Sequence, residues 1–233
     1  MAPPLPILLI PGLLCSPRFF TAQLPLLWRF GPVSIADHTR DDSMTAIARR
    51  ILSTAPRRFA LAGHSMGGYV ALEIMRQAAG RVDRLALLDT TARADLPEQT
   101  EGRRAQIALA ASGRFAEIPD LQLPLLVHPA RHADTTLRTI IREMAEDTGA
   151  DAFVRQQTAI IGRPDSRAGL SEIGCPTLVL VGDSDTLIPP DRSAEMAHAI
   201  PGARLVVVPD CGHMCALEAP VATTNAMIEW LRG

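Results

Sequence analysis

The stretch Phe59-Ala60-Leu61-Ala62-Gly63-His64-Ser65-Met66-Gly67-Gly68 decides how this chain folds. The apolar run FALA predicts a short buried strand, and Gly68–Ala79 has the composition of a helix. Between them, two glycines bracket a serine in the pattern G-x-S-x-G. Small residues two positions on either side of the serine let the strand and the helix approach closely. We therefore expect a sharp turn that presents the Ser65 hydroxyl at the carboxyl end of the strand.

Five other short apolar runs resemble FALA, because they are continuous rather than alternating with polar residues. Such runs are typical of parallel strands covered on both faces. We expect strands at Leu5–Ile10, Val33–Ala36, Phe59–Ala62, Arg84–Leu88, Thr177–Val181 and Arg204–Val208. Helices are expected at Ser43–Ser53, Gly68–Ala79, Asp191–Ala199 and Val221–Leu231. This alternation predicts an α/β fold, with a mostly parallel sheet of about six strands and helices on both faces.

The alternation stops between about residues 92 and 174, where we find no strand pattern. The helical candidates in this stretch are Glu98–Ala111, Arg131–Asp147 and Asp151–Ile161. Prolines punctuate them, which is typical of short helices joined by turns. We therefore expect residues 1–92 and 175–233 to form the α/β core, and residues 93–174 to form an inserted helical cap over one end of the sheet.

Composition excludes several classes of function. The net charge of −2 comes from charges scattered along 233 residues, so we expect no nucleic-acid partner. All 23 basic residues are arginines, which excludes lysine chemistry such as Schiff bases. Met1–Leu14 is apolar, but it lacks the basic start and cleavage site of a signal peptide. No stretch approaches the roughly 18 to 20 apolar residues of a membrane span, so we expect a cytoplasmic protein that does not bind membranes.

The four cysteines do not form a metal-binding or disulfide pattern. None of Cys15, Cys175, Cys211 and Cys215 belongs to a C-x-x-C pair, and we expect reduced thiols. Cys211 and Cys215 flank His213, but a zinc site would need further ligands at matching spacing. We therefore predict no metal site.

A serine hydroxyl needs a base within hydrogen-bond reach to become a nucleophile. His213 follows the predicted strand at Arg204–Val208, on a loop at the same end of the sheet where Ser65 emerges. His64 lies beside the serine, and we assign it a packing role because its side chain points away at such a turn. The other four histidines are expected on loops or helix surfaces: His38, His128, His132 and His198. His213 is therefore the predicted base.

The base in turn needs a carboxylate that fixes its tautomer and stabilises its charged form. Asp183 and Asp185 both follow the predicted strand at Thr177–Val181. Either one fits the chain order serine, aspartate, histidine. Spacing alone does not separate the two.

With these motifs in place, the chain resembles the α/β-hydrolase superfamily, in its small form with a helical cap. The resemblance covers nearly the whole length outside the cap. The family pattern G-x-x-D-x-x-x-P is matched by Gly182, Asp185 and Pro189, and this match favours Asp185 as the acid. The closing pattern, Gly-His followed by Glu and Pro, is matched by Gly212, His213, Glu218 and Pro220.

An oxyanion hole requires two backbone N–H groups aimed at the developing charge. One is expected from Met66, the residue after the serine. The resemblance places the other on the loop after the first strand, where relatives carry His-Gly and this chain has Pro11-Gly12. By position Leu13 is the expected donor, with Leu14 as the alternative. The proline removes a side chain that often braces this loop in relatives.

The resemblance implies a serine hydrolase of the carboxylesterase type, which forms an acyl-enzyme without cofactor or metal. We expect a small-molecule ester or related acyl substrate of modest, largely apolar character, contacted by Leu14, Phe19 and Met214. The alternatives on the same three residues are a carbon–carbon bond hydrolase, a thioesterase or lactonase, and an acyltransferase. A non-catalytic ligand-binding protein is the alternative from another class. The sequence carries no signal for an oligomeric state.

Overall fold

Six parallel strands form one sheet in the computed structural model, which describes residues 4–233. Their order across the sheet is β2-β1-β3-β4-β5-β6. The strands are β1 (Ile7–Ile10), β2 (Val33–Ile35), β3 (Phe59–His64), β4 (Val82–Leu88), β5 (Thr177–Gly182) and β6 (Arg204–Val208). The predicted α/β sheet is confirmed, and each strand boundary lies within two residues of the expected one.

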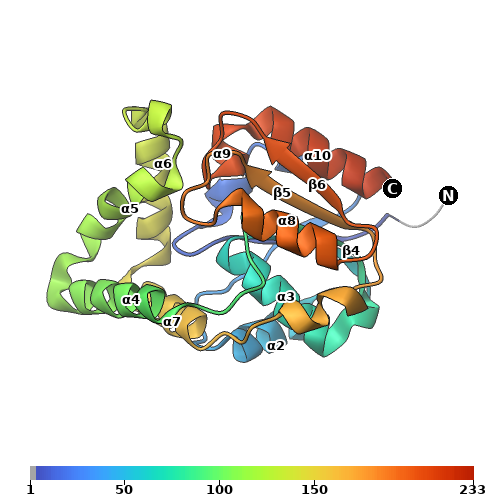
Figure 1. Cartoon of the computed structure of the whole chain (residues 1–233), viewed down its shortest axis with the longest axis horizontal. Coiled ribbons are helices and arrows are strands. Elements are labelled where there is room, and N and C mark those ends of the chain that lie inside the picture. The colour runs from blue at the N-terminus through green and yellow to red at the C-terminus, as the bar shows by residue number, and fades with distance from the viewer. Residues whose placement is uncertain (1–3) are drawn as a thin grey trace.

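Helices cover both faces of the sheet, as the continuous apolar runs predicted (Figure 1). In β1, Ile7 and Leu9 point into one buried apolar cluster, and Leu8 and Ile10 point into the other. The first cluster includes residues of α1 (Leu24–Leu27) and α10 (Pro220–Arg232). The second includes residues of α2 (Met44–Thr54), α3 (Met66–Ala78) and α8 (Pro190–Ala199). Two apolar layers of this kind are the main stabilising term of an α/β domain.

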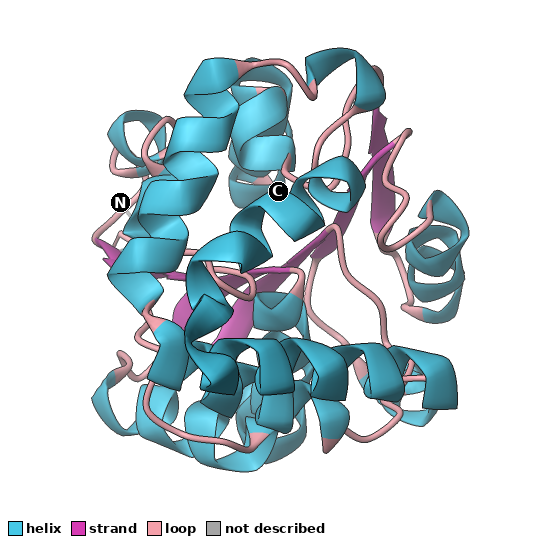
Figure 2. Ribbon diagram, turned by 90° about the vertical axis from the view of Figure 1, so that its left-hand side faces the viewer, coloured by secondary structure: helices cyan, strands magenta, loops and turns pink. Residues whose placement is uncertain are grey.

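The helical segment between β4 and β5 lies beyond one end of the sheet, at the left of Figure 1 and in the foreground of Figure 2. Its α-helices are α4 (Pro97–Leu109), α5 (Ile118–Leu126), α6 (Thr135–Thr148) and α7 (Ala150–Ile161). Short α9 (Cys215–Glu218) belongs to the core. No strand occurs within residues 93–174, in agreement with the sequence pattern.

Helix α5 was not predicted, because prolines at positions 119 and 124 suggested a break. Pro119 lies in the first turn, where its missing N–H costs no hydrogen bond. Pro124 lies inside the helix, which continues only to Leu126. The buried side chains of Ile118 and Leu123 anchor α5 against its neighbours. Tertiary packing thus overrides local propensity in this helix.

The start of α6 also differs from the expectation, at Thr135 rather than Arg131. The Asp134 side chain accepts hydrogen bonds from the N–H groups of Thr136 and Leu137, so it caps the helix there. The preceding residues Pro129–Arg131 form a single 3₁₀ turn.

The carboxyl ends of β3, β4, β5 and β6 lie side by side at one end of the sheet. His64 pairs with Leu88 across β3 and β4, and Gly182 pairs with Val208 across β5 and β6. Residues that directly follow these strands are therefore neighbours in space, although the chain separates them widely. None of the helices in residues 4–233 is long and apolar enough to cross a membrane.

The contact between α3 and β1 generates a stability prediction for Gly67→Ala. A Cβ atom at Gly67 would lie 2.1 Å from the Ile10 carbonyl oxygen, a backbone atom that cannot rotate away. We expect this variant to lose about 1–3 kcal/mol of unfolding free energy, measured by urea denaturation. The control is Gly102→Ala in helix α4, where an added Cβ would meet nothing within 4 Å. Because alanine favours the helix over glycine, the unfolding free energy of this variant should be about 1 kcal/mol higher than that of wild type. Equal stability of the two variants would contradict this account.

Candidate active site

Ser65 sits in a strained turn between β3 and α3. Its backbone has φ 51° and ψ −117°, a conformation that non-glycine residues rarely adopt. The turn is held by hydrogen bonds from Ser65 N–H to the Leu88 carbonyl (2.9 Å) and from the Thr90 hydroxyl to the Ser65 carbonyl (2.8 Å). Gly63 is required because a Cβ there would lie 2.2 Å from the Gly67 carbonyl oxygen. The surrounding structure therefore fixes the position of the serine.

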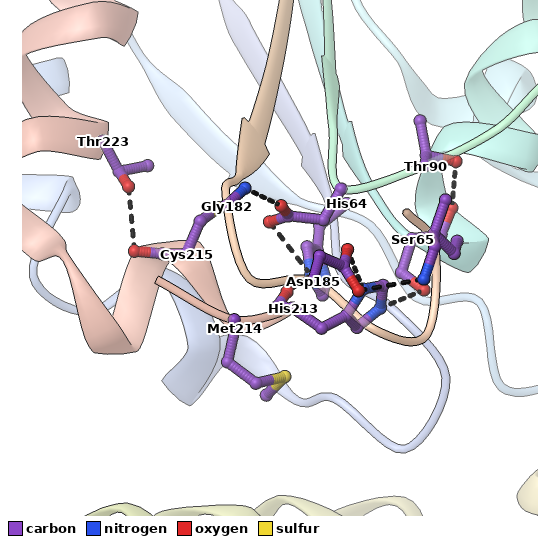
Figure 3. A network of polar contacts seen from close by, with 12 residues as sticks. His64, Ser65, Thr90, Gly182, Asp185, His213, Met214, Cys215 and Thr223 are labelled. Atoms are coloured by element: carbon purple, nitrogen blue, oxygen red, sulfur yellow. Dashed lines mark hydrogen bonds and ion pairs between the residues drawn. The ribbon is translucent and has the colours of Figure 1, made fainter. Parts of the chain in front are cut away.

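Three distant side chains form one hydrogen-bonded row (Figure 3). The Ser65 hydroxyl donates to His213 Nε2 over 2.8 Å. His213 Nδ1 donates to Asp185 Oδ2 over 2.7 Å. The other carboxylate oxygen of Asp185 accepts hydrogen bonds from the N–H groups of Leu187 (3.0 Å) and Ile188 (2.9 Å). The arrangement brings together the three residues predicted as nucleophile, base and acid, each with the partner that its role requires.

Asp183, the other candidate acid, faces a different part of the loop. Its carboxylate accepts hydrogen bonds from the Ser184 hydroxyl and the Cys211 N–H. Some loss of hydration works against the charge, but these hydrogen bonds outweigh it and lower the pKa of Asp183. Asp183 thus ties the β5 loop to the loop after β6 and makes no contact with His213.

The electrostatic surroundings of His213 favour its charged form. Burial alone would lower its pKa, because desolvation penalises the imidazolium. The Asp185 carboxylate, through its charge and its hydrogen bond, reverses this effect and raises the pKa of His213 above its ordinary value. An imidazole in this setting can hold a proton taken from the Ser65 hydroxyl.

Glu218, from the closing sequence pattern, fixes the loop that carries His213. Its carboxylate accepts from Met214 N–H over 3.1 Å and from His128 N–H over 2.7 Å. The His213 N–H itself donates to the Leu126 carbonyl at the end of α5 (2.9 Å). The helical segment and the histidine loop are therefore joined by one hydrogen bond between backbone groups and one from the His128 N–H to the Glu218 side chain.

Two backbone N–H groups near Ser65 are unused. Within residues 4–233, neither the Leu13 N–H nor the Met66 N–H donates a hydrogen bond to a protein acceptor. The Leu14 N–H, the alternative donor, is engaged by the Gln156 side-chain oxygen at 3.2 Å. Leu14 has a left-handed backbone (φ 55°), which marks a sharp turn of this loop. The N–H groups of Leu13 and Met66 are therefore free to donate to a ligand, whereas the N–H group of Leu14 is not.

His38 lies on a loop, as expected from the sequence, but its side chain is buried rather than solvated. Its Nε2 donates to the Gly12 carbonyl over 2.9 Å. Burial lowers the pKa of His38, which favours the neutral ring. His38 thus holds the loop in which Pro11 replaces the histidine of related proteins. The sequence did contain one sign of this role, because His38 closely follows β2 (Val33–Ile35) and so lies at the carboxyl end of the parallel sheet.

His64 and Phe19 pack beneath the site. His64 is buried, stacks on Phe19 with ring centroids 4.0 Å apart, and donates from Nε2 to the His213 carbonyl over 2.8 Å. Burial and the neighbouring His213 hold the pKa of His64 well below its ordinary value. Phe19 was expected to contact substrate. It is instead fully buried between His64 and Phe20, so its role is packing.

A cavity of about 490 Å³ opens over Ser65 and His213. Leu13, Leu14 and Met214 line it near the serine. Further apolar lining comes from the helical segment and the β5 loop, namely Leu125, Leu126, Ile141, Met144, Ile160, Leu187 and Ile188. The volume suits a small organic molecule. Within residues 4–233, no group of three or more His, Cys, Asp or Glu residues is arranged to hold a metal ion.

Asp89 is a further buried carboxyl group that the sequence analysis did not single out. It follows β4 directly, has a left-handed backbone (φ 44°), and accepts from Gly182 N–H over 2.9 Å. Its second oxygen has no hydrogen-bond partner in residues 4–233 and lies 3.8 Å from His64 Nε2. Burial, together with the nearby charge of Asp185, raises the pKa of Asp89 to about 7. This group therefore links β4 and β5 beneath the three-residue row.

The raised pKa of Asp89 gives a pH-dependent stability prediction. Between about pH 4 and 7 the unfolded chain releases this proton while the native protein keeps it, so the native state loses stability as pH rises. Asp89→Asn cannot ionise and tolerates the left-handed backbone. The unfolding free energy of the variant, taken relative to that of wild type, should rise by on the order of 2 kcal/mol from pH 5 to pH 8. Urea denaturation at each pH measures it.

Asp183→Asn is the control for this measurement. The pKa of Asp183 is lowered, so its contribution to the unfolding free energy is already complete at pH 5. The difference in unfolding free energy between Asp183→Asn and wild type should therefore stay constant up to pH 8. Parallel pH profiles for wild type and Asp89→Asn would show that the Asp89 carboxyl does not titrate as inferred.

Comparison with known proteins agrees with the fold. Residues 7–226 match the model of the alpha/beta hydrolase family. The chain is 30% identical to a putative carbamate hydrolase of Azorhizobium caulinodans, over 92% of this chain and 86% of that protein. It is 34% identical to the dihydrolipoyllysine-residue acetyltransferase component of the acetoin cleaving system of Pseudomonas putida, over 74% of this chain, but it spans only 45% of that protein.

Among solved structures, a thermophilic esterase from Thermogutta terrifontis has a TM-score of 0.88 and 31% identity. The match covers 98% of this chain and 89% of that one. The family match over most of the chain and the agreement in fold confirm the resemblance inferred from the motifs. This chain belongs to the alpha/beta hydrolase family.

Proposed function

We propose that this protein is a serine hydrolase that cleaves a carboxylic ester through an acyl-enzyme. The observation that carries the proposal is the hydrogen-bonded row of Ser65, His213 and Asp185 on the wall of a cavity. A buried serine, histidine and aspartate in this order, with two unused N–H groups beside the serine, match the requirements of acyl transfer. The similarity to the Thermogutta terrifontis esterase supports the same class of reaction.

In the proposed first step, the Ser65 oxygen attacks the ester carbonyl carbon and its proton passes to His213 Nε2. The carbonyl π electrons move to the oxygen, where the N–H groups of Leu13 and Met66 stabilise the negative charge. Asp185 stabilises the imidazolium that forms on His213. The tetrahedral intermediate then expels the alcohol oxygen, which takes the proton from His213, and an acyl ester of Ser65 remains.

In the second step, water attacks the acyl-enzyme and gives a proton to His213. The acyl–oxygen bond to Ser65 breaks, the proton returns to the Ser65 oxygen, and the carboxylic acid leaves. We propose that residues 93–174 act as a cap in both steps. Their apolar side chains close the cavity, and the exclusion of water strengthens the electrostatic contacts within it.

Carbamate hydrolysis is a second candidate, because the 30%-identical relative from Azorhizobium is named a putative carbamate hydrolase. A carbamate presents the same carbonyl to Ser65, and it requires no further residue. The reaction type therefore depends on which leaving group the cavity accepts.

Active-site labelling tests the proposed nucleophile. A fluorophosphonate probe should modify wild-type protein at Ser65, and Ser65→Ala should remain unlabelled. Turnover of 4-nitrophenyl esters of rising chain length, followed by absorbance, should fall by about 10⁴-fold or more in Ser65→Ala. Ser53→Ala, which removes an exposed serine of α2, is the matched control and should behave as wild type. Failure of the wild-type protein to react with the probe would refute the proposal.

A further inference from the structure

The cavity over Ser65 has a positively charged wall. Four arginines line it, namely Arg93, Arg103, Arg163 and Arg192. No aspartate or glutamate lines it among residues 4–233. Because the protein around a partly enclosed cavity has a low dielectric constant, any guanidinium charge that is not balanced by a carboxylate produces a positive potential inside the cavity.

The charges of two of these arginines, Arg103 and Arg163, are not fully balanced by nearby carboxylates. Arg103 and Arg163 both pair with the single carboxylate of Asp95, at 2.7 and 2.6 Å. The Arg163 and Asp95 side chains are only 5% and 2% exposed, so water screens them little. Two buried or partly buried guanidinium groups thus share one negative charge, so one positive charge at the cavity wall has no carboxylate partner. Their other hydrogen bonds go to neutral oxygens of Gln157, Arg93 and Ile160.

Arg192, at the start of α8, has the most free hydrogen-bonding capacity of the four. Its only ionic partner within residues 4–233 is its sequence neighbour Asp191, at 3.3 Å, and its side chain is 31% exposed. Arg93, by contrast, is held by two hydrogen bonds to Glu195. The planar donor fork of Arg192 is therefore available to a ligand in the cavity.

This wall is close to the reacting end of the cavity. Tyr69 lies one helical turn after Ser65, and its N–H approaches the Ser65 carbonyl at 3.4 Å. The Arg163 guanidinium lies over the Tyr69 ring, 4.2 Å from its centroid. One side chain therefore separates the positive wall from the backbone of the nucleophile.

We propose that the substrate carries a carboxylate remote from the acyl bond that is cleaved, and that Arg192 and the Arg103–Arg163 pair bind it. This inference rests on the proposed hydrolase function and specifies its substrate class. It also narrows the expectation of a largely apolar substrate. The apolar residues of the other wall, such as Ile141 and Met144, would contact the hydrocarbon part, and the arginines would bind the charged end.

Matched pairs of esters test the proposal, with kcat/KM as the readout. In the first pair, mono-4-nitrophenyl adipate differs from 4-nitrophenyl hexanoate only by a carboxylate in place of the terminal methyl group. In the second pair, 4-carboxyphenyl hexanoate and its neutral 4-carbamoylphenyl analogue place the charge on the leaving group. Wild type should favour the charged ester by about tenfold or more in at least one pair, and added salt should reduce this preference.

Arginine variants show whether the wall causes the preference. Arg192→Gln should lower the charged-to-neutral ratio by about tenfold, and Arg192→Lys should restore part of it. Arg104→Gln is the matched control, because it removes an exposed arginine from α4 that does not line the cavity, and it should keep the wild-type ratio.

The outcomes separate the two proposals. Hydrolysis of neutral esters with no charged preference in either pair would overturn the carboxylate site and leave the hydrolase intact. An equal effect of Arg192→Gln on both members of the pair that shows the preference would do the same. No hydrolysis of any ester by wild type would instead refute the proposed function itself.

Discussion

The close approach of helix α3 to strands β1 and β3 is the constraint on which the rest of the site depends. Gly63 and Gly67 leave no room for a side chain, and their contacts force Ser65 into its left-handed backbone. A relaxed turn would point the hydroxyl elsewhere, and the hydrogen bond to His213 would not form. Strain at one residue, compensated by the packing of two apolar layers, thus fixes the serine at the sheet edge where the other loops converge.

Ionisable groups buried beneath this turn determine which form each imidazole adopts. His213 is hydrogen-bonded to Asp185, which favours its charged state, whereas burial and the neighbouring His213 hold the pKa of His64 well below its ordinary value and favour its neutral form. Asp89 lies near both rings, and its raised pKa limits how much negative charge accumulates there at neutral pH. Two histidines a few ångströms apart therefore differ in charge because their surroundings differ.

The sequence predicted the elements whose signal is local, and it missed those that depend on packing. The strands, the turn at Ser65 and the loops of Asp185 and His213 follow from short motifs next to apolar runs. Helix α5 (Ile118–Leu126) was missed because its prolines weaken the local pattern. The bracing role of His38 and the packing role of Phe19 depend on contacts between distant segments. The arginine wall went unnoticed for the same reason, since its members come from four separate stretches of the chain.

The most direct test of the central claim is a crystal structure of the protein after reaction with a small phosphonate. The account predicts a covalent bond from Ser65 Oγ to phosphorus, with one phosphonyl oxygen about 2.7–3.1 Å from the N–H groups of both Leu13 and Met66. It also predicts that His213 remains hydrogen-bonded to Asp185. An adduct on another residue, or a phosphonyl oxygen turned away from both N–H groups, would contradict it.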